Sequence, residues 1–341
     1  MRGVGRSVRQ ICDECEHSGH DGFNASAPTY PYRKPSKGSE VIDFKDRVAV
    51  VTGAGRGLGA EHAKLLASRG AAVIVNDPGV ATDGTEGEQR PADEVVAAIK
   101  ESGGAAAADY GSVSEPEAAT AMVEKAVEEF GRVDIVINNA GILRDKAFHN
   151  LELENLHAVL DVHLRGAFYV TQPAIRLMRE QGYGRIVMTS SASGLLGNFG
   201  QANYGAAKMG LVGLMNVLAI EGAKHDIKVN AIAPVAGTRM TQELLGPMSD
   251  KLEPALVSPV VAYLASEACA VTGEIYSVAG GTVSRLFIGL TQGWIKHPDA
   301  EGPLTPEDVE ANFAAIRDET DYLVPSTSQD EIQKIAQLLF S

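Results

Sequence analysis

A glycine-rich turn between two apolar runs constrains the fold of this 341-residue chain more than any other feature. The run RVAVVTG (47–53) leads into TGAGRGLG (52–59), a helical pattern follows to Arg69, and AAVIVND (71–77) is a second apolar run. A strand, a turn, a helix and a strand in this order predict a βαβ unit. Glycines in such a turn let the backbone approach a pyrophosphate at the N-terminus of the helix. The unit therefore predicts dinucleotide binding.

This turn and the end of the next strand supply the first candidate site residues. The predicted cofactor-binding residues here are Gly53, Arg56, Gly57, Leu58, Gly59 and Asp77. Asp77 follows Gly59 by 18 residues, about the distance expected for an acid that binds the adenosine ribose. A carboxylate there accepts both ribose hydroxyls and repels a 2′-phosphate, whereas Arg56 would favour that phosphate. Because the acid lies at the ribose itself, we predict NAD as the cofactor.

Strand and helix patterns alternate along the chain to about residue 283. Apolar runs recur at 105–110, 133–141, 184–191, 227–234 and 274–281, with helical patterns between them. This alternation predicts the α/β class, as a Rossmann-type doubly wound parallel sheet with helices on both faces. We expect a disordered leader over 1–43, an NAD-binding and catalytic domain over 44–283, and a helical C-terminal extension over 284–341.

Ligands of such sheets bind at the carboxyl ends of the strands. Ser112 and Val113 fall just after the third predicted strand. We therefore expect both residues to lie where the adenine ring of the cofactor would bind.

The stretch TSSASGLLGNFGQANYGAAK (189–208) places Ser191, Tyr204 and Lys208 at spacings that suit catalysis. Tyr204 and Lys208 are four residues apart, so they share one face of a predicted helix. An ammonium beside a phenol lowers the pKa of the phenol, which makes it a base usable near neutral pH. Ser191, at a strand end, can hold the oxygen whose proton is removed. The alternative is a buried serine and tyrosine beside an ordinary surface lysine, and this spacing alone does not exclude it.

Taken together, TGAGRGLG, Asp77, NNAG (138–141) and the Ser191, Tyr204 and Lys208 set resemble the short-chain dehydrogenase/reductase family over about residues 44–283. The resemblance implies a Rossmann-type sheet, a nicotinamide cofactor and a Ser–Tyr–Lys site. It implies that Tyr204 is the acid/base and that Ser191 holds the substrate oxygen. Lys208 would lower the pKa of Tyr204 and bind the nicotinamide ribose. The further cofactor contacts that it implies are Asn139, Ala140, Gly141, Gly237 and Thr238.

Longer segments, among them VNDPG, NNAGILRDKAF, VHLRGAFYVTQ and APVAGTRMT, give a narrower resemblance. They are similar to the (3R)-3-hydroxyacyl-CoA dehydrogenase unit of the type 2 peroxisomal multifunctional enzymes, also called type 4 17β-hydroxysteroid dehydrogenases. This implies NAD-dependent oxidation of a (3R)-3-hydroxyacyl-CoA and a homodimer formed with the help of the C-terminal extension. Two alternatives stay open: a dehydrogenase of steroid 17β-hydroxyls, and a catalytically silent NAD-binding scaffold, against which the intact Ser–Tyr–Lys spacing argues.

The chain departs from these patterns in two places. His163, in DVHLRG, stands where the broad family usually has an asparagine that helps to relay protons, and we assign it no catalytic role. No hydratase sequence and no S-K-L-type signal follow the dehydrogenase unit. We therefore expect a separate enoyl-CoA hydratase to supply the substrate.

Charge and composition disfavour several classes of partner and location. A net charge of −14 disfavours nucleic-acid and anionic-membrane partners. The sequence has no run of 18 apolar residues, so we expect no membrane span. Its three cysteines form no disulfide framework and its N-terminus lacks the apolar segment of a secretory signal. These features favour a reducing, cytoplasmic location.

Two terminal segments carry further patterns. The leader contains Cys12, Cys15, His17 and His20, whose span is too short for the usual zinc spacing, so we expect no metal site. The extension contains two amphipathic helical patterns, one capped by Thr305 and one with a Ser328–Glu331 capping box. Their apolar faces require a surface to cover, either within their own subdomain or on a partner subunit.

Overall fold

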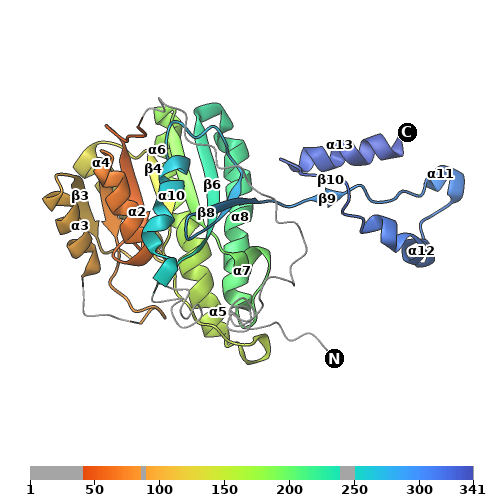
Figure 1. Cartoon of the computed structure of the whole chain (residues 1–341), viewed down its shortest axis with the longest axis horizontal. Helices are drawn as coiled ribbons and strands as arrows, with labels where there is room; N and C mark the ends of the chain where they lie inside the picture. Colours follow the sequence, from red (N-terminus) through yellow and green to blue (C-terminus); the bar gives the residue numbers. More distant parts are fainter. Residues whose placement is uncertain (1–40, 86–89, 239–249, 341) are drawn as a thin grey trace, which may run out of the picture.

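The computed structural model of the chain describes residues 41–85, 90–238 and 250–340. Eight strands form one sheet in the order β3-β2-β1-β4-β5-β6-β7-β8 (Figure 1). Their bounds are β1 Val48–Thr52, β2 Ala72–Asn76, β3 Ala105–Asp109, β4 Ile135–Asn138, β5 Gly184–Thr189, β6 Ile227–Val235, β7 Ile275–Ala279 and β8 Thr282–Leu286. The first seven strands pair in parallel, and β8 pairs with β7 in the antiparallel sense.

The central strands are short apolar runs that are buried on both faces. Every residue of β1, β4 and β5 is buried, as expected for a parallel sheet covered by helices on both sides. The strand order reverses at β1, which pairs with β2 on one side and with β4 on the other. Such a switch in strand order opens a crevice at the carboxyl ends of the strands. The glycine-rich turn follows β1 at this edge.

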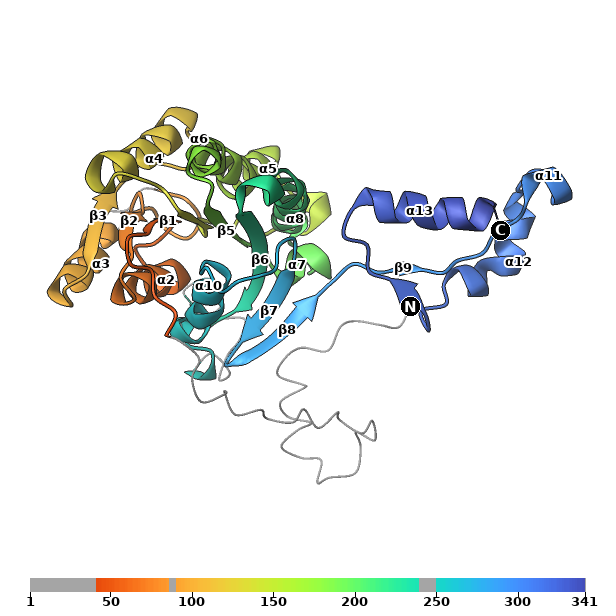
Figure 2. The same ribbon diagram turned by 90° about the horizontal axis from the view of Figure 1, so that it is seen from above.

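Helices cover both faces of the sheet, and Figure 2 shows the two layers from above. One layer contains α2 Gly57–Ser68, α3 Pro91–Glu101 and α10 Ser258–Leu264, and the other contains α4 Pro116–Phe130, α5 Leu153–Leu160, α6 Gly166–Gln181 and α8 Ala202–Gly222. Leu66, Ile99 and Val261 belong to the apolar core on the first face, and Met122, Met178 and Met215 to the core on the second. The predicted Rossmann-type α/β class is confirmed.

The sheet extends further along the chain than the sequence indicated. We expected its last strand at 274–281, but Gly280 and Gly281, with φ of +52° and +85°, turn the chain back into β8. Two successive residues with positive φ form the tight hairpin turn that glycine pairs favour. The last residues of the sheet therefore fall inside the segment that we had assigned to the C-terminal extension.

Beyond β8 the chain forms an arm that projects from the sheet domain (Figures 1 and 2). Its elements are β9 Leu290–Thr291, α11 Pro298–Glu301, α12 Pro306–Ile316, β10 Tyr322–Leu323 and α13 Ser328–Leu339. Thr305 caps α12 as expected. The capping box of α13 is formed by Thr327 and Asp330 rather than by Ser328 and Glu331, because Thr327 has the extended backbone of a cap residue. None of the three helices of the arm has a buried residue.

One described helix, Ala202–His225, is long and apolar enough to cross a bilayer, with a mean hydropathy of 1.3. It packs against β5, β6 and the short helix α7 Ala192–Leu195, and 44% of its apolar window is buried inside the domain. It also carries Tyr204 and Lys208. We therefore treat it as a helix of the domain, and the absence of a membrane span stays a prediction.

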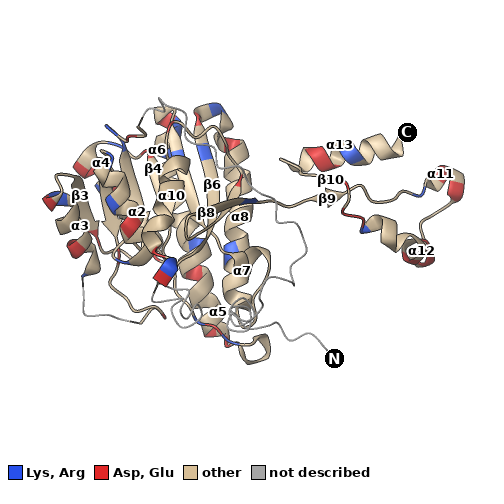
Figure 3. Cartoon of the chain, in the orientation of Figure 1, with Lys and Arg blue, Asp and Glu red and all other residues tan. Residues whose placement is uncertain are grey.

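Charged residues of both signs are interspersed on the helices that cover the sheet, as on α2, α3 and α4 (Figure 3). That the chain does not bind nucleic acid stays a prediction from its net charge. The predicted leader with Cys12, Cys15, His17 and His20 lies almost entirely outside the described residues, and its four metal-ligand candidates lie wholly outside them.

Candidate active site

The turn after β1 disfavours side chains at its glycines, either through the backbone conformation or through lack of room. Gly53 and Gly57 have φ of +61° and +54°, a region that favours glycine. A Cβ at Gly53 would lie 2.8 Å from the Cα of Ala140, and one at Gly59 would lie 2.4 Å from the carbonyl oxygen of Gly53. The turn therefore brings bare backbone to the N-terminus of α2, which is the cradle that a pyrophosphate requires.

The carboxylate of Asp77 lies beside this turn. Its Oδ2 accepts a hydrogen bond of 3.0 Å from the backbone N–H of Gly55, and its Oδ1 accepts one of 2.8 Å from Gly79. A Cβ at Gly55 would lie 2.7 Å from the same Oδ2. Gly55 is thus a fourth glycine of the site, which the spacing of the other three did not identify.

The NNAG segment supports the turn from the adjacent strand. Asn139 Nδ2 donates to the carbonyl oxygens of Thr52 and Gly53, each at 3.0 Å. The hydroxyl of Thr52 accepts from the backbone N–H groups of Asn139 and Ala140, at 3.0 and 3.1 Å. These contacts fix the end of β1 against the end of β4. Thr52 was not predicted, because a threonine at a strand end has no distinguishing sequence signal.

The predicted adenine contacts lie in the loop after β3. Ser112 Oγ lies 2.8 Å from Ser114 Oγ, and Asp109 Oδ1 accepts from Asn76 Nδ2 at 2.7 Å. Val113 is buried, and a Cβ at Gly166 of α6 would lie 2.9 Å from it. The side chain of Val113 therefore belongs to the core, and only its backbone is left to contact a ligand.

The remaining cofactor candidates border the turn. Thr238 lies opposite Gly57, since a Cβ at Gly57 would be 3.6 Å from its Cγ2. The backbone N–H of Gly237 donates to Leu252 at 2.6 Å. Leu58 packs on the core beneath α2, and Arg56 is the N-cap residue of that helix. The predicted set around the turn is thus brought to one edge of the sheet.

Ser191, Tyr204 and Lys208 converge at the same edge, the first from the start of α7 and the other two from α8. Ser191 is the N-cap of α7 at the end of β5, and its hydroxyl is close enough to Tyr204 to lower the pKa of the phenol. Lys208 lies one turn along α8 from Tyr204, with its Nζ 5.4 Å from the centroid of the phenol ring. The same Nζ donates to the carbonyl oxygen of Thr189 at 2.6 Å. A hydroxyl, a phenol and an amine therefore face one another, as the spacing predicted.

The electrostatics of this set differ from the expectation. Burial raises the pKa of the Tyr204 phenol, and the neighbouring Ser191 hydroxyl offsets that rise only in part. Lys208 is itself buried, which lowers the pKa of its amine to about 7. We predicted that the positive charge of Lys208 lowers the pKa of Tyr204. In the protein without a bound cofactor this prediction is wrong, because burial raises the pKa of the phenol and weakens the charge of the amine.

His163 lies within a π-helical turn, Asp161–Arg165, that interrupts the helix between α5 and α6. Its ring packs edge-on against the Tyr204 ring, with the centroids 5.1 Å apart at 89°. Burial and the charge of Lys208 hold the pKa of His163 well below its usual range. The imidazole is therefore neutral at physiological pH.

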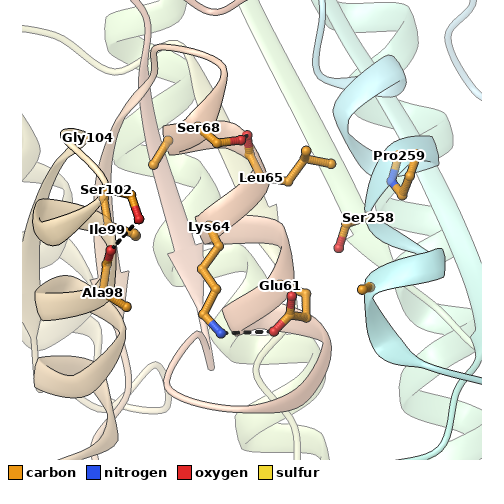
Figure 4. Close-up of a pocket in the computed structure, with 12 residues that line it drawn as sticks. Glu61, Lys64, Leu65, Ser68, Ala98, Ile99, Ser102, Gly104, Ser258 and Pro259 are labelled. Carbon is orange, nitrogen blue, oxygen red and sulfur yellow. Dashed lines mark hydrogen bonds and ion pairs between the residues drawn. The ribbon is translucent and has the colours of Figure 1, made fainter.

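A groove of about 380 Å³ lies between α2, α3 and α10 (Figure 4). Among its lining residues are Lys64, Ser102 and Pro259, and none of the candidate site residues lines it. The candidate site is therefore defined by converging side chains and bare backbone at the sheet edge rather than by this groove.

Comparisons with known proteins agree with this geometry. The sequence matches the family described as short chain dehydrogenase over residues 47–246. A short-chain type dehydrogenase/reductase of Mycobacterium tuberculosis is 52% identical over 275 residues, which are 80% of this chain and 95% of that protein. Peroxisomal multifunctional enzyme type 2 of Drosophila melanogaster is 47% identical over 278 residues, which are 81% of this chain and 46% of that enzyme.

The solved structure of the full-length Drosophila enzyme matches with a TM-score of 0.74 at 38% identity, over 87% of this chain and 50% of that one. The chain thus spans about half of the multifunctional enzyme, in agreement with the resemblance to its dehydrogenase unit. These similarities show that the protein is an oxidoreductase that uses a nicotinamide cofactor. The chain belongs to the short-chain dehydrogenase family.

Proposed function

We propose that the protein oxidises (3R)-3-hydroxyacyl-CoA to 3-ketoacyl-CoA with NAD as the hydride acceptor. The observation that carries the chemistry is the convergence of the Ser191 hydroxyl and the buried amine of Lys208 on the phenol of Tyr204. The similarity to a hydroxyacyl-CoA dehydrogenase of Mycobacterium tuberculosis, 39% identical over 72% of this chain and 81% of that protein, supports the thioester as the substrate.

The choice of NAD over NADP rests on Asp77. Its carboxylate is partly buried at the turn and already accepts two backbone hydrogen bonds. A 2′-phosphate placed against it would meet a negative charge in a site of reduced polarity. The turn, Asp77, Asn139, Lys208 and Thr238 would hold the cofactor, which supplies the hydride acceptor and, when oxidised, a positive charge.

The protein would supply the proton acceptor and the alignment of the substrate. Ser191 donates a hydrogen bond to the substrate oxygen, and Tyr204 as phenolate accepts the hydroxyl proton. The carbinol C–H bond breaks with its electron pair leaving as hydride, and the remaining C–O bond becomes the carbonyl. The amine of Lys208, when charged, favours the phenolate.

Exposed apolar side chains beside this set support an apolar substrate. Phe199 and Leu196 are 89% and 75% exposed in the loop between α7 and α8. Phe148, which is 79% exposed, follows Lys146, and Lys146 bridges to Gln201. Large apolar side chains gathered at a surface mark a binding site. An acyl chain fits this description, and so does a steroid.

We further propose a homodimer and a separate hydratase as partners. The arm exposes Phe313, Ile332, Ile335 and Leu339 at about half of their surface, and a second copy of the chain would cover them. A 3-hydroxyacyl thioester is the product of water addition to a 2-enoyl thioester. A hydratase must therefore precede this step.

The experiment is NADH formation by the full chain with three substrates. These are a (3R)-3-hydroxyacyl-CoA, its (3S) epimer and a 17β-hydroxysteroid. We expect NADH from the (3R) thioester alone. NADH from the steroid alone would assign the enzyme to steroid hydroxyls, and no NADH from any of them would contradict the proposal.

A further inference from the structure

The segment Ile142–Arg144, which follows NNAG, is held from one side by the loop after Asp77. The backbone N–H of Leu143 donates to the carbonyl oxygen of Thr82 at 2.9 Å. Arg144 Nε donates to the carbonyl oxygen of Asp83 at 2.8 Å. These two contacts attach the described part of the 78–90 insertion to the end of β4. The segment Ile142–Arg144 is therefore connected to the end of β2, where Asp77 lies.

On its other side, this segment reaches Tyr204 through His163. The Nε2 of His163 lies 3.0 Å from the backbone nitrogen and 2.8 Å from the carbonyl oxygen of Ile142. A Cβ at Gly141 would lie 2.3 Å from the ring, so only glycine lets the imidazole approach this closely. The anchored ring then packs edge-on against the Tyr204 ring. His163 thus fixes the phenol ring from its side.

A second connection runs through Asn203, which is fully buried. Its Nδ2 donates to the carbonyl oxygens of Arg144 and Asn155, at 3.0 and 3.4 Å. Its Oδ1 accepts from the backbone N–H of Tyr204 at 2.9 Å. That N–H is one of the first in α8, which have no partner within the helix. Asn203 thus fixes the backbone of Tyr204 to the same segment.

We infer that His163 and Asn203 are positioning residues that together hold Tyr204 against the segment Ile142–Arg144. The inference rests on the proposed acid/base role of Tyr204. Asn203 fixes the backbone position from which the side chain starts, and His163 packs against the ring itself. Displacement of a catalytic group by about 1 Å costs up to about 100-fold in rate. Both contacts therefore matter to turnover although neither residue needs to exchange a proton.

The variants separate the two contacts that His163 makes. His163→Gln keeps a polar group that can reach Ile142 and removes the ring. His163→Phe keeps a ring beside Tyr204 and removes the hydrogen bond between Nε2 and the backbone of Ile142, which costs stability. Asn203→Ala removes the link to the backbone of Tyr204. The matched controls are His157→Gln and Asn216→Ala, which change the same residue types at exposed positions.

We expect His163→Gln and Asn203→Ala each to lower kcat by about 10- to 100-fold, with the dissociation constant for NAD changed by less than about 3-fold. His163→Phe is expected to keep a higher kcat than His163→Gln despite a lower melting temperature. The double variant should lose less than the product of the single losses, because both residues act on one side chain. The controls should match the wild type.

A second readout does not depend on turnover. The phenol of Tyr204 is titrated as the ultraviolet difference between each protein and its Tyr204→Phe counterpart. We expect the pKa to fall towards its ordinary value in both single variants, because a loosened ring gains solvent.

If the pKa of Tyr204 and kcat are both unchanged in the variants, the inference is overturned. It is also overturned if kcat falls in proportion to the melting temperature across all variants. If the wild type oxidises no tested substrate, the proposed function fails, whereas the titration still decides whether these residues hold the ring.

Discussion

The Nζ of Lys208 donates a 2.6 Å hydrogen bond to the carbonyl oxygen of Thr189, the last residue of β5. This contact fixes the amine beneath the end of the strand that precedes Ser191. It leaves the amine buried, with its pKa lowered to about 7. The buried amine of Lys208 therefore lowers the stability of the cofactor-free protein, while its proposed role is to favour the phenolate of Tyr204.

Replacement of Lys208 by methionine should stabilise the cofactor-free protein. The pKa of the amine is about 7 in the folded state and 10.5 unfolded, so folding releases a proton between these values and the free energy of unfolding rises with pH across them. At pH 7 the variant should gain about 1–4 kcal/mol, and the gain should shrink towards pH 10. Denaturant unfolding of Lys208→Met checks this, with exposed Lys100→Met as control. A less stable variant at pH 7 would contradict it.

Tyr204→Phe should abolish turnover and leave cofactor binding intact. The phenol oxygen is the proposed proton acceptor, and loss of a general base costs about 10²- to 10⁴-fold in rate. The measurements are kcat with the preferred substrate and the dissociation constant for NADH by fluorescence. Tyr263→Phe, at an exposed position on α10, is the matched control. Turnover within a few-fold of the wild type would remove Tyr204 from its role.

Asp77→Asn should weaken discrimination between the two nicotinamide dinucleotides. The carboxylate accepts hydrogen bonds from ribose hydroxyls in the proposed complex, and a charged hydrogen bond contributes about 1.5–3 kcal/mol. We expect kcat/KM for NAD to fall by about 10- to 100-fold and that for NADP to rise. Steady-state rates with both cofactors measure the ratio. If the wild type already prefers NADP, the assignment of NAD is wrong.

His62→Gln should make the protein less sensitive to acid. His62 is buried between α2 and α10, with Nδ1 2.8 Å from Ser258 Oγ, and burial lowers its pKa to about 3. Below pH 6.5 His62 binds a proton in the unfolded state but not in the folded state, so the free energy of unfolding falls as pH drops. The full loss is on the order of 5 kcal/mol. Unfolding from pH 7 to pH 4 should show a smaller slope for His62→Gln than for exposed His157→Gln. Equal slopes would refute the assignment of this loss to His62.

Ile335→Asp should convert the proposed dimer to a monomer. Ile335 lies on the apolar face of α13 with Ile332 and Leu339, and a buried charge at an interface is costly. Size-exclusion chromatography with light scattering measures the mass. Gln337→Asp, at an exposed position on the other side of α13, is the control. A chain truncated after Ile288 keeps β8 and should also be a monomer, and a dimer that survives both changes would place the interface elsewhere.

The sequence predicted most of the sheet, because its strands are continuous apolar runs and its cofactor turn is marked by glycines. It missed β8, since the Gly280–Gly281 hairpin follows a strand that already completed the expected pattern. It also missed Gly55, Thr52 and Asn203, whose roles depend on contacts between distant segments.

The predicted direction of the Tyr204 pKa shift was wrong for a related reason. The spacing between Tyr204 and Lys208 reveals that a cation is near the phenol, but it does not reveal that both groups are buried. Burial opposes the charged form of each group. The geometry of a site of this kind is thus readable from motifs, whereas its electrostatics require the packed structure.

The transfer of deuterium from the substrate to the cofactor tests the central proposal most directly. The full chain is incubated with NAD and a (3R)-3-hydroxyacyl-CoA that carries deuterium on C3, and the NADH formed is examined by mass spectrometry. We predict that every NADH molecule carries one deuterium and that the Tyr204→Phe variant forms none. Absence of NADH with this substrate, or NADH without deuterium, would contradict the account.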